Sequence, residues 1–466
     1  MKKKFLKFVT TLLAVCMATT LFVGCGGGGS GSGDGDTSTP GLIFVLVEGK
    51  SEYRLVDAGN EARLLKNITI PATYNDLPVT EIGTDAFYGY TAVESVTLPS
   101  SIKVIGEEAF SSCENLKSIT LPNGLKSIGK EAFADCYDLT SVSIPDSVTD
   151  IGLFAFDSCE SLTYTVKDNV EYLGNSNNPY LYLNGAVQEH IGEITSLVID
   201  SRCKFIGEYA FSGCYDLASV TLPDGIISIG DEAFSNCYDL TYNEYGVSKY
   251  LGSATNQHLY LVGPQSMNVG SAEAVEGCKI IASNAFSGCK NLTDFNIANT
   301  VTSIGSNAFE ECTNLLSITI PDSVTSIGDS VFEGCTRLSS AVIGNGLTII
   351  NEYTFGGCTS LTNVTIGNGV KTIGWEAFYN CSSLANLTIP SSVILIHSCA
   401  FEDCISLTNV TFEDTTSTWY RTSEHSDYLH RTNSLEIDVT NSSSNAQQLK
   451  TVWVGFDLVS CYWYKV

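Results

Sequence analysis

The chain repeats every 23 residues, and this period limits what it can fold into more than any other feature. Eleven cysteines fall into three groups, and consecutive cysteines within a group are 23 residues apart. They are Cys113, Cys136 and Cys159, then Cys214 and Cys237, then Cys289, Cys312, Cys335, Cys358, Cys381 and Cys404. A phenylalanine precedes each by three residues, and one earlier unit carries Phe87 with Tyr90 in the cysteine position. A repeat of about 20–50 residues is typical of a solenoid, in which each unit forms one coil and packs only against its neighbours.

The unit from Leu315 to Thr336 shows how one repeat can form a coil. Leu315, Ile318 and Ile320 have the spacing of a strand whose alternate side chains enter a core. The segments that follow are a turn at Pro321 and Asp322, an inward-facing return leg with Val324 and Ile327, and a short helical turn from Ser330 to Gly334 that buries Phe332. One unit cannot cover its own apolar side, so we expect the coils to stack into one core with parallel strands about 4.8 Å apart.

The segment from Ile144 to Cys159 shows the repeat in full. It contains Ile144-Pro145, Val148, Ile151-Gly152, Ala155-Phe156 and Cys159. This segment resembles the I-x-I-P-x-x-V-x-x-I-G-x-x-A-F-x-x-C unit of the BspA-like leucine-rich repeats. The resemblance covers about Leu77 to Phe412, apart from two interruptions. It implies a curved leucine-rich-repeat solenoid with a parallel β-sheet and short helical turns on the other side. It also implies a bacterial surface or secreted protein, in a class where several members are adhesins.

The period places a solenoid at residues 77–414, with inserts at about 163–203 and 241–278. Both inserts have short alternating runs separated by Asn, Gly and Pro, which predicts a β-hairpin projecting from the stack. Each insert returns to the repeat through a cysteine, Cys203 or Cys278, in the position of Val324. Inserts of this kind often lie on a binding side, although an elaborated coil without a ligand also explains them. Residues 41–76 predict an N-terminal hairpin cap, and residues 415–466 a C-terminal cap.

The first forty residues have the pattern of an export signal and a tether. Three lysines precede an apolar stretch that ends in Gly24-Cys25. This ending resembles the lipobox of bacterial lipoproteins, which implies that residues 1–25 form the signal and that Cys25 carries the lipid. A secretory signal cut near Ala18 and an uncleaved anchor helix are the alternatives. Residues 26–40, rich in Gly and Ser, predict a flexible tether. We therefore expect an exported protein that is lipid-anchored at the bacterial cell surface or outer membrane.

The composition excludes some partners and offers no sign of catalysis. The formal net charge is −27, so we expect no binding to nucleic acid. The ladder of cysteines predicts buried free thiols rather than disulfides, because all of them point into the core and eleven is an odd number. Neither the histidines nor the cysteines have zinc-ligand spacing, and no nucleophile elbow or phosphate loop is present. We expect no metal, no cofactor and no enzymatic activity.

The strand pattern predicts an exposed row of small polar side chains on the sheet. The candidate contact residues lie between the inward residues of successive strands: Thr97, Thr120, Ser143, Thr221, Asn296, Thr319, Thr365, Thr388 and Thr411. Such a row offers hydrogen bonds at regular spacing, although threonine also favours exposed strand positions without any ligand. The leading hypothesis is an adhesin-type module that recognises an extracellular protein of a host or another microbe. The alternatives are a glycan-capturing lipoprotein that uses Trp419 and Trp453, if they are exposed, and a passive surface-coat protein.

Overall fold

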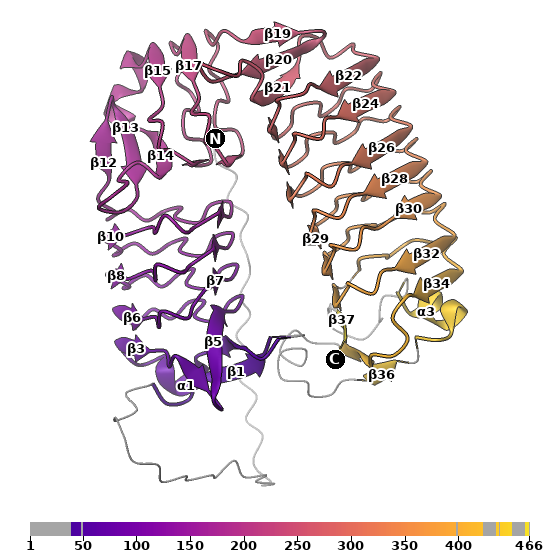
Figure 1. Cartoon of the computed structure of the whole chain (residues 1–466), viewed down its shortest axis with the longest axis horizontal. Helices are drawn as coiled ribbons and strands as arrows, with labels where there is room; N and C mark the ends of the chain where they lie inside the picture. Colours follow the sequence, from indigo (N-terminus) through magenta and orange to yellow (C-terminus); the bar gives the residue numbers. More distant parts are fainter. Residues whose placement is uncertain are drawn as a thin grey trace, which may run out of the picture. The chain divides into compact units, whose positions relative to one another are not determined.

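A computed structural model describes residues 39–47, 50–397, 399–422, 435–437, 439–449 and 462–465. All of them belong to one compact unit, Ser38–Val466. The expected signal, the lipid-anchor residue Cys25 and the expected tether as far as residue 38 lie outside the described residues, and so does Trp453. The structure confirms the predicted fold class, since the repeats form a stack of coils with parallel sheets, hairpin inserts and caps (Figure 1).

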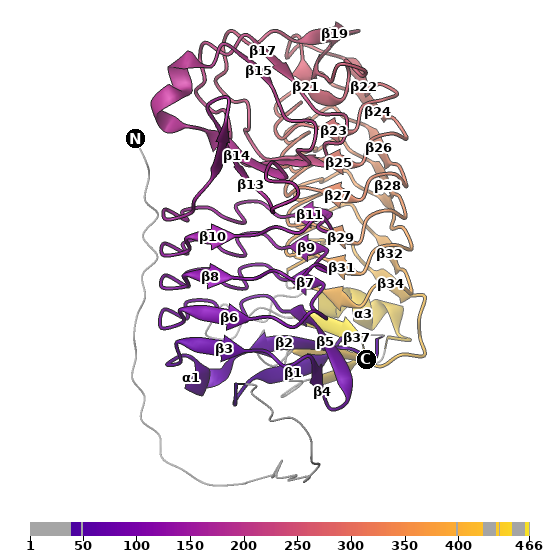
Figure 2. The ribbon, with the colours of Figure 1, turned by 60° about the vertical axis from the view of Figure 1, so that its left-hand side comes forward.

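Each coil contributes two short strands to the stack. In the coil of Leu315, the first strand is β26 (Ser317–Ile320), in which Ile318 and Ile320 are buried and the residues between them are exposed. The return leg, expected only to point inward, forms a second strand, β27 (Ser326–Ile327). Its register is parallel to the return leg of the preceding coil. The solenoid therefore has two walls of parallel strands, which Figure 2 shows as one row with β6, β8 and β10 and another with β7, β9 and β11.

The strands of the first wall, which we call the first-strand face, are β3 (Asn67–Thr69), β6 (Ser95–Thr97), β8 (Ser118–Ile119), β10 (Ser141–Val142), β15 (Ser196–Val198), β17 (Ser219–Thr221), β22 (Ser271–Ala274), β24 (Asp294–Ile297), β26, β28 (Ser340–Ile343), β30 (Asn363–Thr365), β32 (Asn386–Ile389) and β34 (Asn409–Phe412). The strands of the other wall, the second-strand face, are β5 (Leu77–Ile82), β7 (Val104–Ile105), β9 (Ser127–Ile128), β11 (Asp150–Ile151), β16 (Phe205–Ile206), β18 (Ser228–Ile229), β23 (Ile280–Ile281), β25 (Ser303–Ile304), β27, β29 (Ile349–Ile350), β31 (Thr372–Ile373) and β33 (Leu395–Ile396).

The segment expected to be a short helical turn is a run of tight turns that also bonds to the next coil. The Glu333 N–H donates to the Ser330 carbonyl at 3.1 Å, so the turn closes over three residues rather than four. The Phe332 N–H points to the next coil and donates to the Thr354 carbonyl at 2.9 Å. The backbone of this segment therefore joins successive coils, as the strands do.

The phenylalanines form a column of stacked rings through the coils. Phe309, Phe332 and Phe355 are fully buried, and neighbouring ring centroids lie 5.4 Å apart with interplanar angles of 9° and 12°. The column is interrupted at each insert, where a tyrosine meets the last ring nearly edge-on. Tyr182 lies 5.7 Å from Phe156, and Tyr260 lies 6.2 Å from Phe234.

The ladder cysteines are free, buried thiols with a specific partner. The Cys335 thiol donates to the Phe309 carbonyl at 3.2 Å, and the Cys358 thiol donates to the Phe332 carbonyl at the same distance. Nine of the eleven ladder thiols bond in this way to the coil before their own, and the exceptions, Cys214 and Cys289, are the first ladder cysteines after the two inserts. This hydrogen bond explains why cysteine, rather than a purely apolar side chain, recurs at this position.

The two inserts form antiparallel hairpins, but they do not project freely from the stack. In the first insert β12 (Thr165–Lys167), β13 (Val170–Leu173) and β14 (Tyr182–Ala186) form a meander, and β14 then pairs in parallel with β16. The second insert repeats this arrangement with β19 (Asn243–Tyr245), β20 (Ser248–Leu251), β21 (Tyr260–Pro264) and a parallel pairing to β23. Each insert is therefore built into the second-strand face. A 3-10 helix, η1 (Gln188–Glu193), follows β14 in the first insert alone among the described residues.

Antiparallel strands cover both ends of the second-strand face. At the N-terminal end β1 (Ile43–Leu46) pairs with β2 (Tyr53–Asp57), which pairs in parallel with β5. The short elements α1 (Gly59–Ala62) and β4 (Thr73–Tyr74) lie between them in the sequence. At the C-terminal end β37 (Tyr462–Lys465) pairs antiparallel with β33 and with β35 (Trp419–Thr422). The strand β36 (Leu435–Ile437) completes this sheet, and α3 (Ser442–Leu449) contacts β34.

Candidate functional site

The predicted polar row lies on the first-strand face, in register from coil to coil. Thr319 is aligned with Val342 and then with Thr365, and Thr388 is aligned with Thr411. Eight of the nine candidate residues are exposed, and Thr221 is half-buried. Most of the serines and asparagines two positions earlier, such as Ser317 and Asn363, are exposed as well, and Ser95 is half-buried. The structure thus brings these side chains together as a ladder of hydroxyl and amide groups, which Val342 interrupts between Thr319 and Thr365.

The second-strand face is less open than the first-strand face. Lys130 in an early coil lies 3.7 Å from Asp329 in a late coil, measured from Nζ to Oδ2. A cavity of about 210 Å³ between these coils is lined by both residues and by Asp231. A large partner therefore has easier access to the first-strand face.

Trp419 does not meet the condition for a sugar-stacking residue. Its side chain is 1% exposed and packs edge-on against Phe412 at 4.8 Å. Trp463 is also buried, with its ring parallel to that of Phe412. The expectation that Trp419 contacts a glycan is wrong, because the indole closes the apolar end of the last coil.

Exposed aromatic rings are present elsewhere, at a stacked pair that the sequence reasoning missed. Tyr215 and Tyr238 are 57% and 74% exposed, and their ring centroids lie 5.6 Å apart at 15°. Both follow a ladder cysteine directly, in consecutive coils. The repeat spacing could have revealed the pair, since residues in the same position of adjacent coils must lie side by side.

Three potential metal ligands from neighbouring coils also meet. Glu376, Cys399 and Glu402 place their ligand atoms within 4.8 Å of one another, and all three are half-buried. Elsewhere in the ladder, burial raises the pKa of the Cys113 and Cys312 thiols to about 12, which keeps them protonated and unreactive at neutral pH. We assign no metal to the cluster, since two half-buried carboxylates and one thiol also occur together without an ion.

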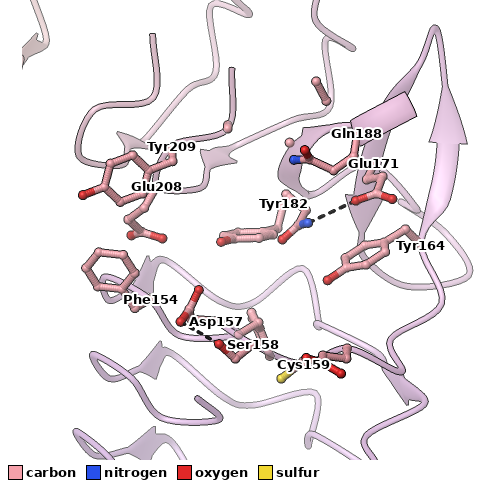
Figure 3. A pocket seen from close by; sticks show the side chains of 16 residues that line it. Phe154, Asp157, Ser158, Cys159, Tyr164, Glu171, Tyr182, Gln188, Glu208 and Tyr209 are labelled. Carbon is pink, nitrogen blue, oxygen red and sulfur yellow. Dashed lines mark hydrogen bonds between the residues drawn. The ribbon is translucent and has the colours of Figure 1, made fainter. Parts of the chain in front are cut away.

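The first insert encloses a cavity of about 400 Å³ (Figure 3). Its walls are the turn segment 154–160, the strands β13 and β14, and the turn of the next coil around Glu208. Burial raises the pKa of Glu208 to about 7, and the charges of Asp231 and Asp157 add to this effect. Burial also raises the pKa of Glu171, whose carboxylate accepts a hydrogen bond from Asn184 at 3.2 Å.

The two-walled stack with its 23-residue coil defines a solenoid of the leucine-rich-repeat class. The chain belongs to the family described as BspA type leucine rich repeat region, whose profile matches residues 60–179, 187–253, 265–384 and 330–443. These segments cover more than half of the chain. None of the curated proteins matches it. Among the described residues, no helix is long and apolar enough to cross a membrane.

Several solved structures of bacterial leucine-rich-repeat proteins are similar to this chain. A leucine-rich repeat protein from Bacteroides ovatus is 26% identical, with 81% of this chain and 88% of that chain covered and a TM-score of 0.28. A leucine rich cell surface protein from Faecalibacterium prausnitzii is 27% identical, with 81% and 95% covered and a TM-score of 0.29. One from Eubacterium ventriosum is 22% identical, with 78% and 93% covered and a TM-score of 0.31. The TM-scores are low, and membership of the family rests on the profile match.

Proposed function

We propose that this protein is an adhesin-type binding module that recognises an extracellular protein through the first-strand face and catalyses no reaction. The observation that carries the proposal is the exposed ladder of Thr, Ser and Asn side chains. Residues such as Thr319 and Thr365 offer donors and acceptors at the spacing of the coils, on the more accessible wall. A protein partner with an extended segment could bond to several coils at once, so modest single contacts would add up.

A binding screen of the purified full chain against matrix glycoproteins and mucins tests this proposal. Thr319→Lys with Thr365→Lys should weaken a selective protein contact at least about tenfold, because two bulky charges would interrupt the ladder. Ser326→Lys is the matched control, since Ser326 is exposed on the second-strand face of the same coil as Thr319. Equal losses in both variants would contradict a contact through the first-strand face. Failure to bind any target would favour a passive surface-coat protein.

A second candidate function is glycan capture, and the Tyr215–Tyr238 pair favours it. Sugar rings stack on exposed aromatic faces, and these two rings are parallel and solvent-facing. A hit on a glycan array that Tyr215→Ala and Tyr238→Ala abolish would support this function. If those substitutions leave such a hit unchanged, the tyrosine pair is not the site.

We further propose that the protein is exported and anchored by lipid on Cys25, at the cell surface or outer membrane. The support is the sequence pattern before and after this cysteine. Cys25→Ala should move the protein from the membrane fraction to the soluble fraction and prevent labelling by a fatty-acid analogue. Labelling that persists in Cys25→Ala would contradict the assignment.

A further inference from the structure

The cavity of the first insert exists because the bonding between coils is interrupted there. In the preceding pair of coils, the backbone N–H groups of Phe133 and Asp135 donate to the carbonyls of Ala155 and Asp157 at 2.9 and 3.0 Å. The next turn segment of the repeat type begins only near Glu208, and β14 comes between. The space that a regular coil would fill therefore stays open, with one coil on each side of it.

Carboxylates and aromatic rings dominate the chemistry of this cavity. Its lining contains no lysine, arginine or histidine. The acidic residues of the lining are Asp157, Glu160, Glu171 and Glu208, and its aromatic residues are Phe154, Phe156, Tyr164, Tyr182 and Tyr209. Carboxylates and aromatic faces both attract cations, and the attraction grows when the site is partly removed from water.

Tyr182 supplies a second and independent sign of a ligand. Its side chain is only 5% exposed, and among the described residues its hydroxyl group has no hydrogen-bond partner. A phenolic hydroxyl group without a protein partner is available to bond to a polar group that enters the cavity. Figure 3 shows the hydroxyl end of Tyr182 directed toward the side of the cavity where Phe154 and Glu208 lie. Gly207 leaves room for it, since a Cβ there would lie 2.6 Å from the hydroxyl oxygen.

The second insert has a cation at the position that corresponds to Glu171. Glu171 pairs with Gly185 just before a register shift, and Lys249 has the same position opposite Gly263. The Lys249 ammonium lies 5.6 Å from the ring centroid of Tyr242, the counterpart of Tyr164. There the chain supplies its own cation.

The carboxylates of the first cavity are replaced around that lysine, although Glu232 stands there in the place of Phe154. Ser283 stands in the place of Glu208, and Ser235 stands in the place of Asp157. The first insert keeps Tyr164 and Tyr182 and adds carboxylates, but the lining of its cavity has no lysine.

We propose that the cavity of the first insert binds a primary alkylammonium group, supplied by a free aliphatic amine or by a lysine side chain of a partner protein. In the bound state an ammonium group donates either to the Glu208 carboxylate and the Tyr182 oxygen, or to the Glu171 carboxylate with Tyr164 beside it. A volume of about 400 Å³ is within the usual range for small-molecule sites. This site is separate from the first-strand face, so the inference does not rest on the proposed adhesin contact.

Calorimetric titration of the full chain with 1,5-diaminopentane tests the proposal, with 1,5-pentanediol as the neutral control of similar length. We expect the diamine to bind and the diol to bind at least about tenfold more weakly. A peptide with one central lysine forms a second arm: binding of the peptide points to a protein partner, and binding of the diamine alone points to a free amine. If neither the diamine nor the peptide binds, or if the diol binds as well as the diamine, the proposal is overturned.

Two variants locate the binding. Glu171→Gln should weaken diamine binding at least about tenfold, whereas Lys249→Gln, at the same position of the second insert, should leave it unchanged. If circular dichroism shows that Glu171→Gln does not fold, Tyr182→Phe takes its place. Tyr182→Phe should weaken diamine binding about threefold or more. Binding that both first-insert variants leave unchanged would also overturn the proposal.

Discussion

The two inserts share a backbone plan and differ in the side chains that face their interior. Both run as an antiparallel meander into a parallel strand of the second-strand face, with a register shift at the same position. Both place a tyrosine, Tyr182 or Tyr260, next to the last ring of a phenylalanine column. The first insert, however, has Glu171 where the second has Lys249.

The backbone plan and the chemistry of an insert are therefore determined by different residues. The residues that pack each meander against the coils are shared between the two inserts. One example is Leu183, which is buried like its counterpart Leu261. Two tyrosines of the interior are shared as well, but its charged residues, such as Glu171 and Lys249, are not. A solenoid can therefore gain a binding cavity at an interruption without changing the coils on either side.

The largest effect should come from the column that both inserts interrupt. Phe332→Ala removes a fully buried ring with a stacked neighbour on each side, and we expect it to cost about 3–5 kcal/mol in the free energy of unfolding. Phe156→Ala should cost less, because Phe156 meets Tyr182 edge-on and borders the cavity. Urea unfolding of both variants measures the difference. An unchanged midpoint for Phe332→Ala would be incompatible with a stacked solenoid core.

Glu171→Lys should turn the first insert into a copy of the second. The new ammonium would lie near Tyr164, as Lys249 lies near Tyr242, and would occupy the place of the ligand. We expect diamine binding to fall by more than about tenfold, with an unfolding midpoint close to that of the unchanged chain. Calorimetry gives the first quantity and thermal unfolding the second. Full binding in this variant would show that the ligand lies elsewhere.

The pH dependence should also separate the inserts, because Glu208 has no carboxylate counterpart in the second insert. Burial raises its pKa to about 7, so the empty folded protein holds this proton more tightly than the unfolded chain does. Its contribution to stability is therefore present at low pH and is lost as the pH rises through about 7. Diamine affinity should change in the opposite direction and rise severalfold from pH 6 to pH 8, as the Glu208 carboxylate ionises beside Asp157 and Asp231.

Glu208→Gln provides the check on that assignment. In this variant the rise in affinity between pH 6 and pH 8 should disappear, and the change in melting temperature over the same range should become smaller. A pH profile identical to that of the unchanged chain would mean that another group titrates.

The smallest effect should come from the glycine beside Tyr182. Ala282 stands in the second insert where the first has Gly207. Gly207→Ala would place a Cβ against the Tyr182 hydroxyl oxygen and shift it. We expect diamine binding to weaken about threefold. An effect as large as that of Glu171→Lys would indicate that the backbone of the insert has moved.

Much of the fold could be predicted from the sequence because the same pattern of apolar residues recurs in many repeats. The period shows that the positions of Phe332 and Cys335 recur from coil to coil. The alternation of Ile318 and Ile320 defines the first strand. The second strand was missed because two residues such as Ser326 and Ile327 are too short to show an alternation. The hydrogen bond from the Cys335 thiol was missed because its acceptor is a backbone carbonyl of another coil.

The candidate sites were harder to predict, for reasons that differ between them. The polar ladder follows from alternation alone, so the exposure of Thr319 and Thr365 could be predicted. The buried state of Trp419 could not, because a tail without a repeat gives no register. The cavity of the first insert joins Phe154, Glu171 and Glu208 from three separate segments. Only the placement of β14 between two coils brings them together.

The most direct test of the account is a crystal structure of the full chain grown with 1,5-diaminopentane. We expect the coils and both inserts as described, with an ammonium nitrogen within hydrogen-bond distance of Glu208 and the Tyr182 hydroxyl group, or of Glu171. The counterpart space beside Tyr242 should contain Lys249 and no diamine. A first-insert cavity that is closed by the chain's own side chains, or that excludes the diamine at saturating concentration, would contradict the account.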